Sequence, residues 1–465
     1  MIHVEEVDTL TLGAGGGAYP AGFALARAGQ RVVMVDPKGV TSGNCLAEGC
    51  VPSKAVFEAV ELRRRLSGPV GRAAGGLGGP PDYAAIVAWK DGVQRRRYAQ
   101  HDRELAATPT LRLVAGTGRL VDPHTVDVTT EDGVHRYRAS SIILATGSDV
   151  YVPPLEGAEL CVTSRDLFAL EPSVTALPAR LAVIGGGYVG LEVACMYRAL
   201  GVEVTVIEAL PTLLAGMDPD FVALIAAGLD PAITLRLSSP VRRVTRVEGG
   251  LRVHVARDGE ETTVDADMVL LAVGRRPVLA EGASELGLAL SGHGLAVDPA
   301  MRVPGHAHLY APGDVNGRSM LFHSAVRQSM VAAHNILAGN RAVDRVDFDA
   351  VPATVFTTPS GAFVGLTRAS GAARGVDLVE AAYSFEEDSR AQILGETDGE
   401  IRLFFDPGSL RLRGGWVVGV DAAQLIGQIG TATAAGLSAY DLARFADQHP
   451  MAAEGLDRAA RSLVG

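Results

Sequence analysis

The stretch Gly13-Ala14-Gly15-Gly16-Gly17-Ala18 decides how the first part of this chain folds. A β-rich run at 7–12 precedes it, and a run typical of a helix, 21–28, follows it. A second predicted strand, 31–35, ends at Asp36. The order strand, Gly-rich turn, helix, strand and acid predicts a dinucleotide-binding unit in its G-x-G-x-x-A form.

Each small residue of this turn has a physical role. Gly13 permits the tight turn, Gly15 lets the backbone approach a pyrophosphate, and Ala18 allows the helix to pack closely. The amino end of the helix offers free N–H groups to phosphate oxygens, and Asp36 can accept hydrogen bonds from ribose hydroxyls. A Gly-rich turn alone is compatible with an ordinary loop, but the acid at the end of the second strand favours binding.

A second copy of the pattern occurs further along the chain. A predicted strand at 181–184 runs into Gly185-Gly186-Gly187-Tyr188-Val189-Gly190, a helix at 191–200 follows, and a strand at 202–207 ends at Glu208. Glu208 follows Gly185 by 23 residues, the same interval that separates Asp36 from Gly13. Two patterns with one spacing predict two dinucleotide sites.

Directly after the first pattern lies Gly43-Asn44-Cys45-Leu46-Ala47-Glu48-Gly49-Cys50-Val51-Pro52-Ser53-Lys54-Ala55. It holds two of the four cysteines, with four residues between them, ahead of a predicted helix at 55–65. The amino end of a helix favours a thiolate, so the pair is interpreted as a redox dithiol. A structural disulfide closing so small a loop stabilises little, and a zinc site lacks a second ligand pair. Two unrelated buried thiols remain the alternative.

Composition narrows the classes of function. A chain of 465 residues predicts about three domains, and a net charge of −11 argues against nucleic acid or an anionic membrane as partner. No apolar run reaches the roughly 18 residues that span a bilayer. The acidic start lacks an export leader and cysteines are few, so a cytoplasmic location is expected. No metal site is expected.

The remaining segments are less distinctive. Residues 55–107 are predicted to be mostly helical, with a loop at 68–81, and 111–128 are β-rich. The end of the chain, 344–465, alternates apolar and polar runs and includes two predicted amphipathic helices. Cys161 and Cys195 have no partner at reactive spacing and are predicted to be buried structural thiols.

The ordered set of motifs resembles the FAD-dependent pyridine nucleotide–disulfide oxidoreductases over essentially the whole chain. The motifs that carry the resemblance are the C-x-x-x-x-C pair, Ala145-Thr146-Gly147, Gly274-Arg275-Arg276-Pro277, Tyr310-Ala311-Pro312-Gly313-Asp314, Met320-Leu321-Phe322-His323 and the final His449-Pro450-Met451-Ala452-Ala453-Glu454, which matches H-P-x-x-x-E. The third part of the chain also resembles the interface domain of that family.

The resemblance implies an α/β fold class with two doubly wound, Rossmann-like dinucleotide-binding domains and an α+β C-terminal dimerisation domain. Residues 1–150 are expected to form the FAD-binding domain with the dithiol, completed by 276–343. Residues 151–275 are expected to form the NAD-binding domain, and 344–465 the interface domain of a homodimer.

The resemblance also implies the roles of the reacting groups. Cys50 would be the thiolate beside the flavin, and Cys45 the thiol that exchanges with substrate. Lys54 would lie beside flavin N5 with Glu192 as its ion-pair partner, although both could pass for surface charges by sequence alone. His449 would act as acid and base, and Glu454 would orient it. Tyr188 would gate the nicotinamide pocket. Taken alone, His449 is more typical of a solvated helix end.

The cofactor contacts implied by the resemblance form two sets. Those for FAD are Gly13, Gly15, Ala18, Asp36, Lys54, Gly116, Thr146, Gly147, Asp314, Met320, Leu321, Phe322 and His323. Those for NAD are Gly185, Gly187, Tyr188, Gly190, Glu208, Val241 and Gly274.

Two absences indicate the branch of the family. NADP-preferring members carry arginines after the second fold's second strand, whereas here Glu208 is followed by 209–214 without a cation, which favours NAD. Mercuric reductases and large thioredoxin reductases carry a further C-terminal cysteine pair, but no cysteine follows Cys195. The branch resembled most is dihydrolipoamide dehydrogenase, whose partner would be a lipoyl-bearing carrier protein or free dihydrolipoamide.

Five positions depart from the usual pattern: Ser42 and Asn44 before the first cysteine, Ser360 and Gly361 in the interface domain, and Gln424. Two other functions stay open. One is an NAD(P)H-dependent reductase of another small disulfide or persulfide. The other is a redox-inert flavoprotein that serves as a binding module, against which the intact cysteine pair, His449 and Glu454 argue.

Overall fold

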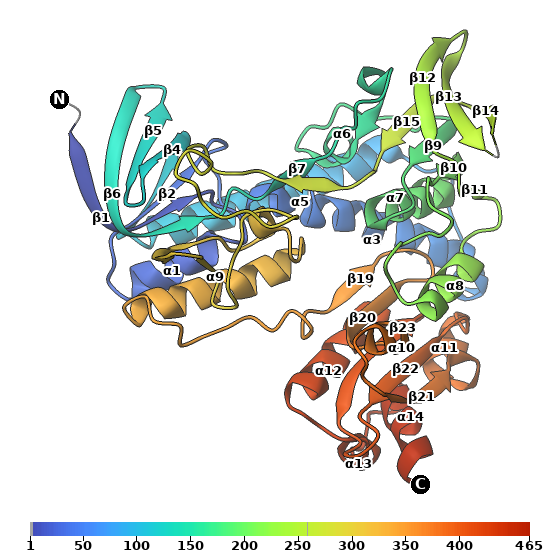
Figure 1. Cartoon of the computed structure of the whole chain (residues 1–465). Helices are drawn as coiled ribbons and strands as arrows, with labels where there is room; N and C mark the ends of the chain where they lie inside the picture. The colour runs from blue at the N-terminus through green and yellow to red at the C-terminus, as the bar shows by residue number, and fades with distance from the viewer. Residues whose placement is uncertain (1–2, 258) are drawn as a thin grey trace.

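In the computed structural model, which describes residues 3–257 and 259–465, a mainly parallel sheet forms the first domain (Figure 1). Its strands read as apolar runs because both faces are covered. In order across the sheet they are β17 (Arg302–Val303), β18 (His306–Tyr310), β6 (Gly133–Leu144), β1 (Val4–Leu12), β2 (Val32–Asp36) and β3 (Leu111–Ala115), with β4 (Thr117–Asp122) and β5 (Thr125–Thr130) beside β6. Strands from the start of the chain and from beyond residue 300 therefore share one sheet.

Two helices pack side by side against this sheet (Figure 1). They are α1 (Tyr19–Arg27), which follows the first Gly-rich turn, and α9 (Phe322–Leu337). The Ala21 amide donates to the Ser329 hydroxyl at 3.0 Å across their contact. The later segment of the chain thereby completes the packing around the first turn.

A helical arm follows β2. It consists of α2 (Gly43–Ala47), α3 (Cys50–Ser67), α4 (Pro69–Ala73) and α5 (Tyr83–Ala106). The helix predicted at 55–65 in fact begins at Cys50, which makes that cysteine its first residue. The prediction of a plain loop at 68–81 is wrong in part, because Pro69, which is well tolerated in a first helical turn, starts the short helix α4.

The second domain has its own parallel sheet. Its strands, in order, are β11 (Thr234–Arg236), β10 (Glu203–Ile207), β9 (Arg180–Ile184), β15 (Met268–Leu271) and β8 (Val162–Thr163). An antiparallel set, β12 (Val241–Val247), β13 (Gly250–Arg257) and β14 (Glu260–Ala266), lies beside it, and the helices are α6 (Ser164–Phe168), α7 (Tyr188–Ala199) and α8 (Pro219–Gly228). The chain enters and leaves this domain through the paired strands β7 (Ser148–Val150) and β16 (Arg275–Pro277).

The third domain is an antiparallel sheet covered by helices. Its strands, in order, are β19 (Ala353–Val355), β20 (Gly361–Gly365), β23 (Leu412–Val418), β22 (Glu400–Phe405) and β21 (Val379–Ser384). The two predicted amphipathic helices are confirmed as α12 (Ala422–Ala434) and α14 (Glu454–Val464), each of which buries one face. Five helices occur within residues 353–464: those two and the unexpected α10 (Arg368–Ala373), α11 (Ser389–Leu394) and α13 (Ala439–Ala443). The three unexpected helices are one or two turns long, too short for a periodic pattern to reveal.

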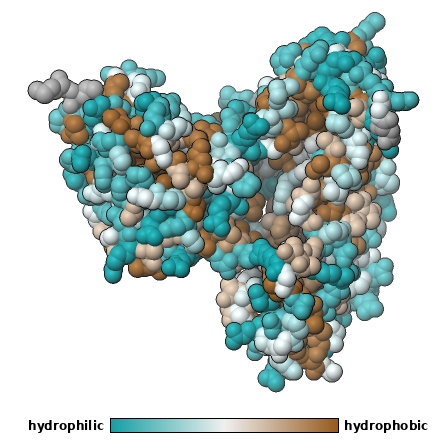
Figure 2. All heavy atoms as spheres, viewed as in Figure 1, coloured by the Kyte–Doolittle hydropathy of each residue, from teal (hydrophilic) through white to brown (hydrophobic). Residues whose placement is uncertain are grey.

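The predicted fold class is confirmed: two domains with parallel sheets and a C-terminal α+β domain. Figure 2 shows that the surface is notched between the lobe that carries β1–β6 and the lobe that carries β12–β14. Among the residues that the structure describes, no helix combines the length and apolar character needed to cross a bilayer.

Candidate active site

One large cavity of about 1590 Å³ runs between the first two domains. Its lining includes both Gly-rich turns, both cysteines of the dithiol, and residues 312–314 and 319–323. Pockets that hold one small ligand usually measure about 300–1,000 Å³. The cavity is therefore large enough for more than one extended ligand.

The two Gly-rich turns have matching geometry at their first glycine. Gly13 has a φ of +105°, and a Cβ there would lie 2.2 Å from the Ala145 carbonyl oxygen. Gly185 has a φ of +114°, and its Cβ would lie 2.4 Å from the Ala272 oxygen. Only glycine fits either place. In each domain the turn is thus pressed against the end of a neighbouring strand, where a dinucleotide's pyrophosphate is held in such folds.

The acids that end the second strand of each pattern hold the turns themselves. The Ala14 amide donates to Asp36 Oδ2 at 3.1 Å, and the Gly186 amide donates to Glu208 Oε2 at 2.7 Å. A carboxylate has about four lone-pair positions, so each acid keeps capacity for a ribose hydroxyl. Burial raises the pKa of Asp36, while the amides of Lys38 and Ala14 oppose that effect.

Most of the predicted cofactor contacts line the cavity. On the first domain's side they are Gly13, Gly15, Asp36, Lys54, Gly116, Thr146, Gly147, Asp314, Met320, Leu321, Phe322 and His323, and on the second domain's side Gly185, Gly187, Tyr188, Glu208, Val241 and Gly274. Ala18 and Gly190 do not line it. Ala18 is fully buried, and a Cβ on Gly190 would lie 2.0 Å from the Gly185 oxygen, so both act through close packing beneath the turns.

Three side chains predicted to contact FAD, those of Asp314, Thr146 and His323, already bond to other residues of the protein. The Ser148 hydroxyl donates to Asp314 Oδ2 at 2.6 Å, and burial raises the pKa of Asp314. The Thr146 hydroxyl donates to the Val278 carbonyl. His323 Nε2 lies 2.6 Å from the Pro352 oxygen, so its ring is fixed to the chain that leads into the third domain.

The dithiol spans the junction of two helices. Cys45 lies in α2 and Cys50 begins α3, both are free thiols, and Cys50 is exposed to the cavity. A hydrogen bond between them lowers the pKa of Cys50 to about 7, with the Lys54 cation acting in the same direction, and it raises the pKa of Cys45. Cys50 is therefore the thiol that ionises first, as helix amino ends favour.

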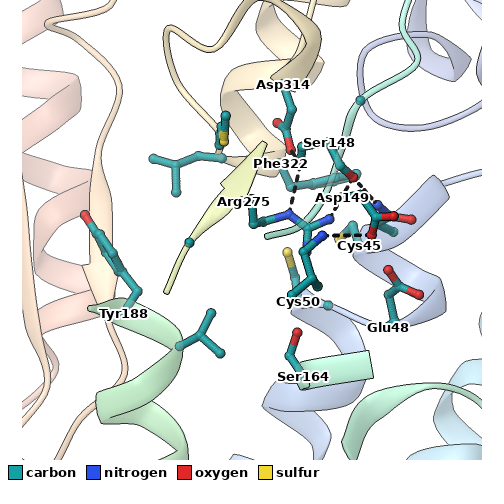
Figure 3. A pocket seen from close by; sticks show the side chains of 18 of the residues that line it. Cys45, Glu48, Cys50, Ser148, Asp149, Ser164, Tyr188, Arg275, Asp314 and Phe322 are labelled. Carbon is teal, nitrogen blue, oxygen red and sulfur yellow. Dashed lines mark hydrogen bonds between the residues drawn. The ribbon is translucent and has the colours of Figure 1, made fainter. Parts of the chain in front are cut away.

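Lys54 lies one helical turn after Cys50 and is fixed from two sides. Its Nζ is 2.7 Å from Glu192 Oε2 on α7 and 4.2 Å from the centre of the Phe356 ring. The Phe356 amide in turn donates to Glu192 Oε1 at 3.1 Å. The three domains thus meet at one ion pair beside Cys50. Figure 3 shows Tyr188, at the start of α7, across the cavity from Cys50.

A charged cluster around the dithiol was not expected from the sequence. Glu48, between the two cysteines, is buried and accepts from Arg165 Nε at 2.8 Å and Nη2 at 3.0 Å, and Lys38 Nζ lies 3.5 Å away. Arg165 also donates to Asp149 Oδ1 at 2.6 Å. Arg165 holds the pKa of Glu48 below its usual value against the effect of burial. Glu48 itself, an acid within the dithiol stretch, was the one sequence feature that could have indicated this cluster. Nothing in the sequence indicates Arg165 as its partner.

The two departures before Cys45 have structural partners. Ser42 has a φ of +73°, where glycine is favoured, and its hydroxyl lies 2.9 Å from His101 Nε2. Asn44 accepts from Lys38 Nζ at 2.9 Å and donates to the Ser148 oxygen at 2.8 Å. Asn44 therefore links the dithiol helix to the strand that leaves the first domain.

His449 lies apart from the dithiol within this chain. It precedes α14, near the C-terminal end of the third domain, whereas α3 lies in the middle of the molecule (Figure 1), and it is not part of the cavity lining. Its Nδ1 lies 2.9 Å from Glu454 Oε1, and its side chain is 67% exposed. The pair is thus formed and solvent-facing, and a single chain does not bring it to Cys45.

The other cysteines differ from each other. Cys195 is buried, as predicted, but the prediction for Cys161 is wrong: it is only half-buried, because strand β8 next to it lies at the edge of its sheet. Within residues 3–257 and 259–465, no group of three or more His, Cys, Asp or Glu side chains could hold a metal ion.

Known proteins similar to this chain cover it from end to end. The dihydrolipoyl dehydrogenase of Geobacillus stearothermophilus is 32% identical over 99% of this chain and 97% of its own length. That of Thermus scotoductus is 33% identical over 99% of this chain and 98% of its own length. Among solved structures, LpdA from Mycobacterium tuberculosis superposes with a TM-score of 0.88 at 26% identity, covering 98% and 99% of the two chains. The flavoprotein disulfide reductase RclA from Escherichia coli, at 24% identity and a TM-score of 0.85, shares the fold.

Two family descriptions match consecutive parts of the sequence. "Pyridine nucleotide-disulphide oxidoreductase, dimerisation domain" matches residues 351–460, which supports a homodimer, and "Pyridine nucleotide-disulphide oxidoreductase" matches residues 7–329. FAD and NAD are the cofactors of these proteins, and the two matching Gly-rich turns on one cavity fit two dinucleotides. Because the match over residues 7–329 alone spans well over half of the sequence, this chain belongs to the pyridine nucleotide–disulphide oxidoreductase family.

Proposed function

We propose that this flavoprotein oxidoreductase is an NAD-linked dihydrolipoamide dehydrogenase. The observation that carries the proposal is the hydrogen-bonded pair of thiols with a low pKa at Cys50, exposed to a cavity that both Gly-rich turns line. Relatives of that name match nearly the whole chain. Glu208 without a following cation favours NAD over NADP, and no cysteine after Cys195 supplies a second redox pair.

The substrate's first thiol would lose its proton to the partner subunit's His449, whose Nδ1 is oriented by Glu454. The resulting substrate thiolate attacks Cys45 in the Cys45–Cys50 disulfide. The S–S bond breaks, Cys50 leaves as a thiolate, and a mixed disulfide forms between Cys45 and substrate. The low pKa makes Cys50 the better leaving group.

The second substrate thiol attacks the substrate sulfur of the mixed disulfide. This closes the cyclic disulfide product and releases Cys45 as a thiol, so two electrons now reside in the dithiol. Lys54, held by Glu192, keeps a positive charge beside the Cys50 thiolate, and Tyr188 would cover the nicotinamide side of the cavity. FAD, when bound, supplies the transfer of that electron pair as hydride to NAD.

A direct assay tests the proposal. NAD reduction is measured with free dihydrolipoamide beside a panel of other small dithiols, and NADH oxidation with a panel of small disulfides and persulfides. We expect the highest kcat/KM with dihydrolipoamide. A higher kcat/KM with another disulfide would make the chain a reductase of that compound. No turnover with any of them, in protein that holds flavin, would indicate a redox-inert binding module.

A further inference from the structure

Helix α5 carries a lysine with no exposure to solvent. The Lys90 side chain is 0% exposed. Its Nζ donates to Asp91 Oδ1 at 2.5 Å, Gln94 Oε1 at 2.9 Å and the Ala169 carbonyl oxygen at 2.5 Å. A buried ammonium is costly unless its donors are satisfied, and here all three are. Burial lowers the pKa of Lys90, while the bond to Asp91 opposes that effect.

Lys90 fixes the orientation of the Gln94 amide. Since an ammonium only donates, the oxygen of Gln94 must face it, and the NH₂ group must point the other way. That NH₂ group donates to the carbonyls of Leu46 and Ala47, each at 2.9 Å. Gln94 is fully buried, so no solvent competes for these bonds.

Those two carbonyls lie between the reactive cysteines. Leu46 and Ala47 end α2, where carbonyls lack partners inside the helix. Lys90 also donates to the carbonyl of Ala169, the residue that follows α6, and Arg165 of α6 donates to the Glu48 carboxylate. The segment 45–50 is thus tied at two points to one short helix of the second domain.

We propose that Lys90 and Gln94 are positioning residues that hold the Cys45 thiol next to Cys50 and so stabilise the disulfide form of the pair; this rests on the redox function proposed above. The stability of a disulfide relative to its two thiols follows their effective concentration, which rises when the chain that joins them is held in one arrangement. We call the hydrogen bonds that run from Lys90 through Gln94 to the carbonyls of Leu46 and Ala47 the relay. In the disulfide form the S–S bond already holds the segment 45–50 in place, so the relay restrains mainly the dithiol form.

The sharpest test is Gln94→Glu. Glutamate keeps the shape and the acceptor for Lys90 but replaces the two N–H donors by an oxygen facing two carbonyl oxygens. We expect the dithiol–disulfide equilibrium to shift toward the dithiol by about tenfold, which raises the midpoint potential by about 30 mV for a two-electron couple. The measurement is titration of the flavin-loaded protein in thiol redox buffers, with alkylation of Cys45 and Cys50 read by peptide mass spectrometry.

Tyr83→Phe is the matched control. Tyr83 lies on the same helix α5 and is buried, and its hydroxyl forms a hydrogen bond of 2.9 Å with that of Tyr197 in the second domain, rather than with the segment 45–50, Lys90 or Gln94. The Tyr83→Phe variant loses a buried hydrogen bond between two domains, and it should leave the midpoint potential of the Cys45–Cys50 pair unchanged. Lys90→Met, which frees the Gln94 amide to turn, should shift the equilibrium in the same direction as Gln94→Glu.

The outcomes separate the two proposals. If the wild-type pair never titrates as a disulfide, the proposed function fails. If it titrates normally and folded Gln94→Glu and Lys90→Met both match Tyr83→Phe, the positioning role is overturned. If Tyr83→Phe shifts as far as the other two, the effect belongs to the domain contact in general and the relay is likewise rejected. Should Gln94→Glu not fold, Lys90→Met against Tyr83→Phe decides.

Discussion

Lys54 Nζ and Glu192 Oε2 lie 2.7 Å apart, and this ion pair joins the helix that begins at Cys50 to the helix that begins at Tyr188. The two charges act on Cys50 with opposite sign: Lys54 lowers its pKa and Glu192 raises it. The helix of the dithiol and the helix of the second Gly-rich turn are thereby coupled through charge as well as packing.

Because Lys54 and Glu192 shift the pKa of Cys50 in opposite directions, replacing each of them tests whether nearby charge controls the ionisation of Cys50. Cys50 ionises as pH rises through about 7. Lys54→Met should move that midpoint to higher pH and reduce the alkylation rate of Cys50 at pH 7 about fivefold, because the thiolate loses a neighbouring cation. Glu192→Gln should move the midpoint to lower pH. The measurement is the pH dependence of Cys50 alkylation by peptide mass spectrometry. Shifts of the same sign in both variants would mean that disrupted helix packing, not charge, causes the effect.

The two cysteines should differ in their absorption signature. On two-electron reduction the protein should show a thiolate–flavin charge-transfer band at long wavelength. Cys50→Ser should abolish it, because Cys50 starts α3 and has the lower pKa. Cys45→Ser should show the band without reduction, since the introduced hydroxyl can still donate a hydrogen bond to a Cys50 thiolate that can no longer form a disulfide. The band appearing in Cys50→Ser instead would exchange the roles of the two thiols.

Nucleotide preference should follow Glu208. A carboxylate and a 2′-phosphate about 4 Å apart repel by about 1 kcal/mol at the dielectric of water, and by more where water is excluded. An energy of about 1 kcal/mol corresponds to a roughly fivefold difference in kcat/KM. Wild type should therefore prefer NAD to NADP at least fivefold, and Glu208→Gln should narrow that ratio. Glu203→Gln, at the exposed start of the same strand β10, is the matched loss of charge and should change nothing. An NADP preference in wild type would contradict the assignment.

The distance between His449 and the cavity predicts a site shared between subunits. Cys50→Ser and His449→Ala should each be almost inactive as purified homodimers. Unfolded together and refolded as a mixture, about half of the dimers are mixed, and each mixed dimer holds one intact site, so about a quarter of wild-type activity should return. Each variant refolded alone is the control. If both refold and mix without recovery, the partner subunit's His449 does not complete the site.

Local sequence patterns were sufficient to predict the two dinucleotide folds, because their signals are steric: a first glycine that no side chain can replace, and an acid 23 residues later. They were also sufficient for the dithiol, whose spacing and helix lie within one short stretch. Apolar runs, being local, likewise predicted four strands, β1, β2, β9 and β10, to within a few residues of their observed bounds.

The surroundings of the dithiol, by contrast, depend on how distant segments fold together. Arg165 and Lys90 lie 117 and 42 residues from Glu48, too far along the chain for any spacing rule, and each is an ordinary surface residue by type. Folding places one against a buried carboxylate and the other wholly inside the protein. A charge is tolerated there only where partners from other segments satisfy it. The same reason applies to His449: its pairing with Glu454 is local and was predictable from the sequence, whereas its separation from Cys45 depends on how three domains are arranged.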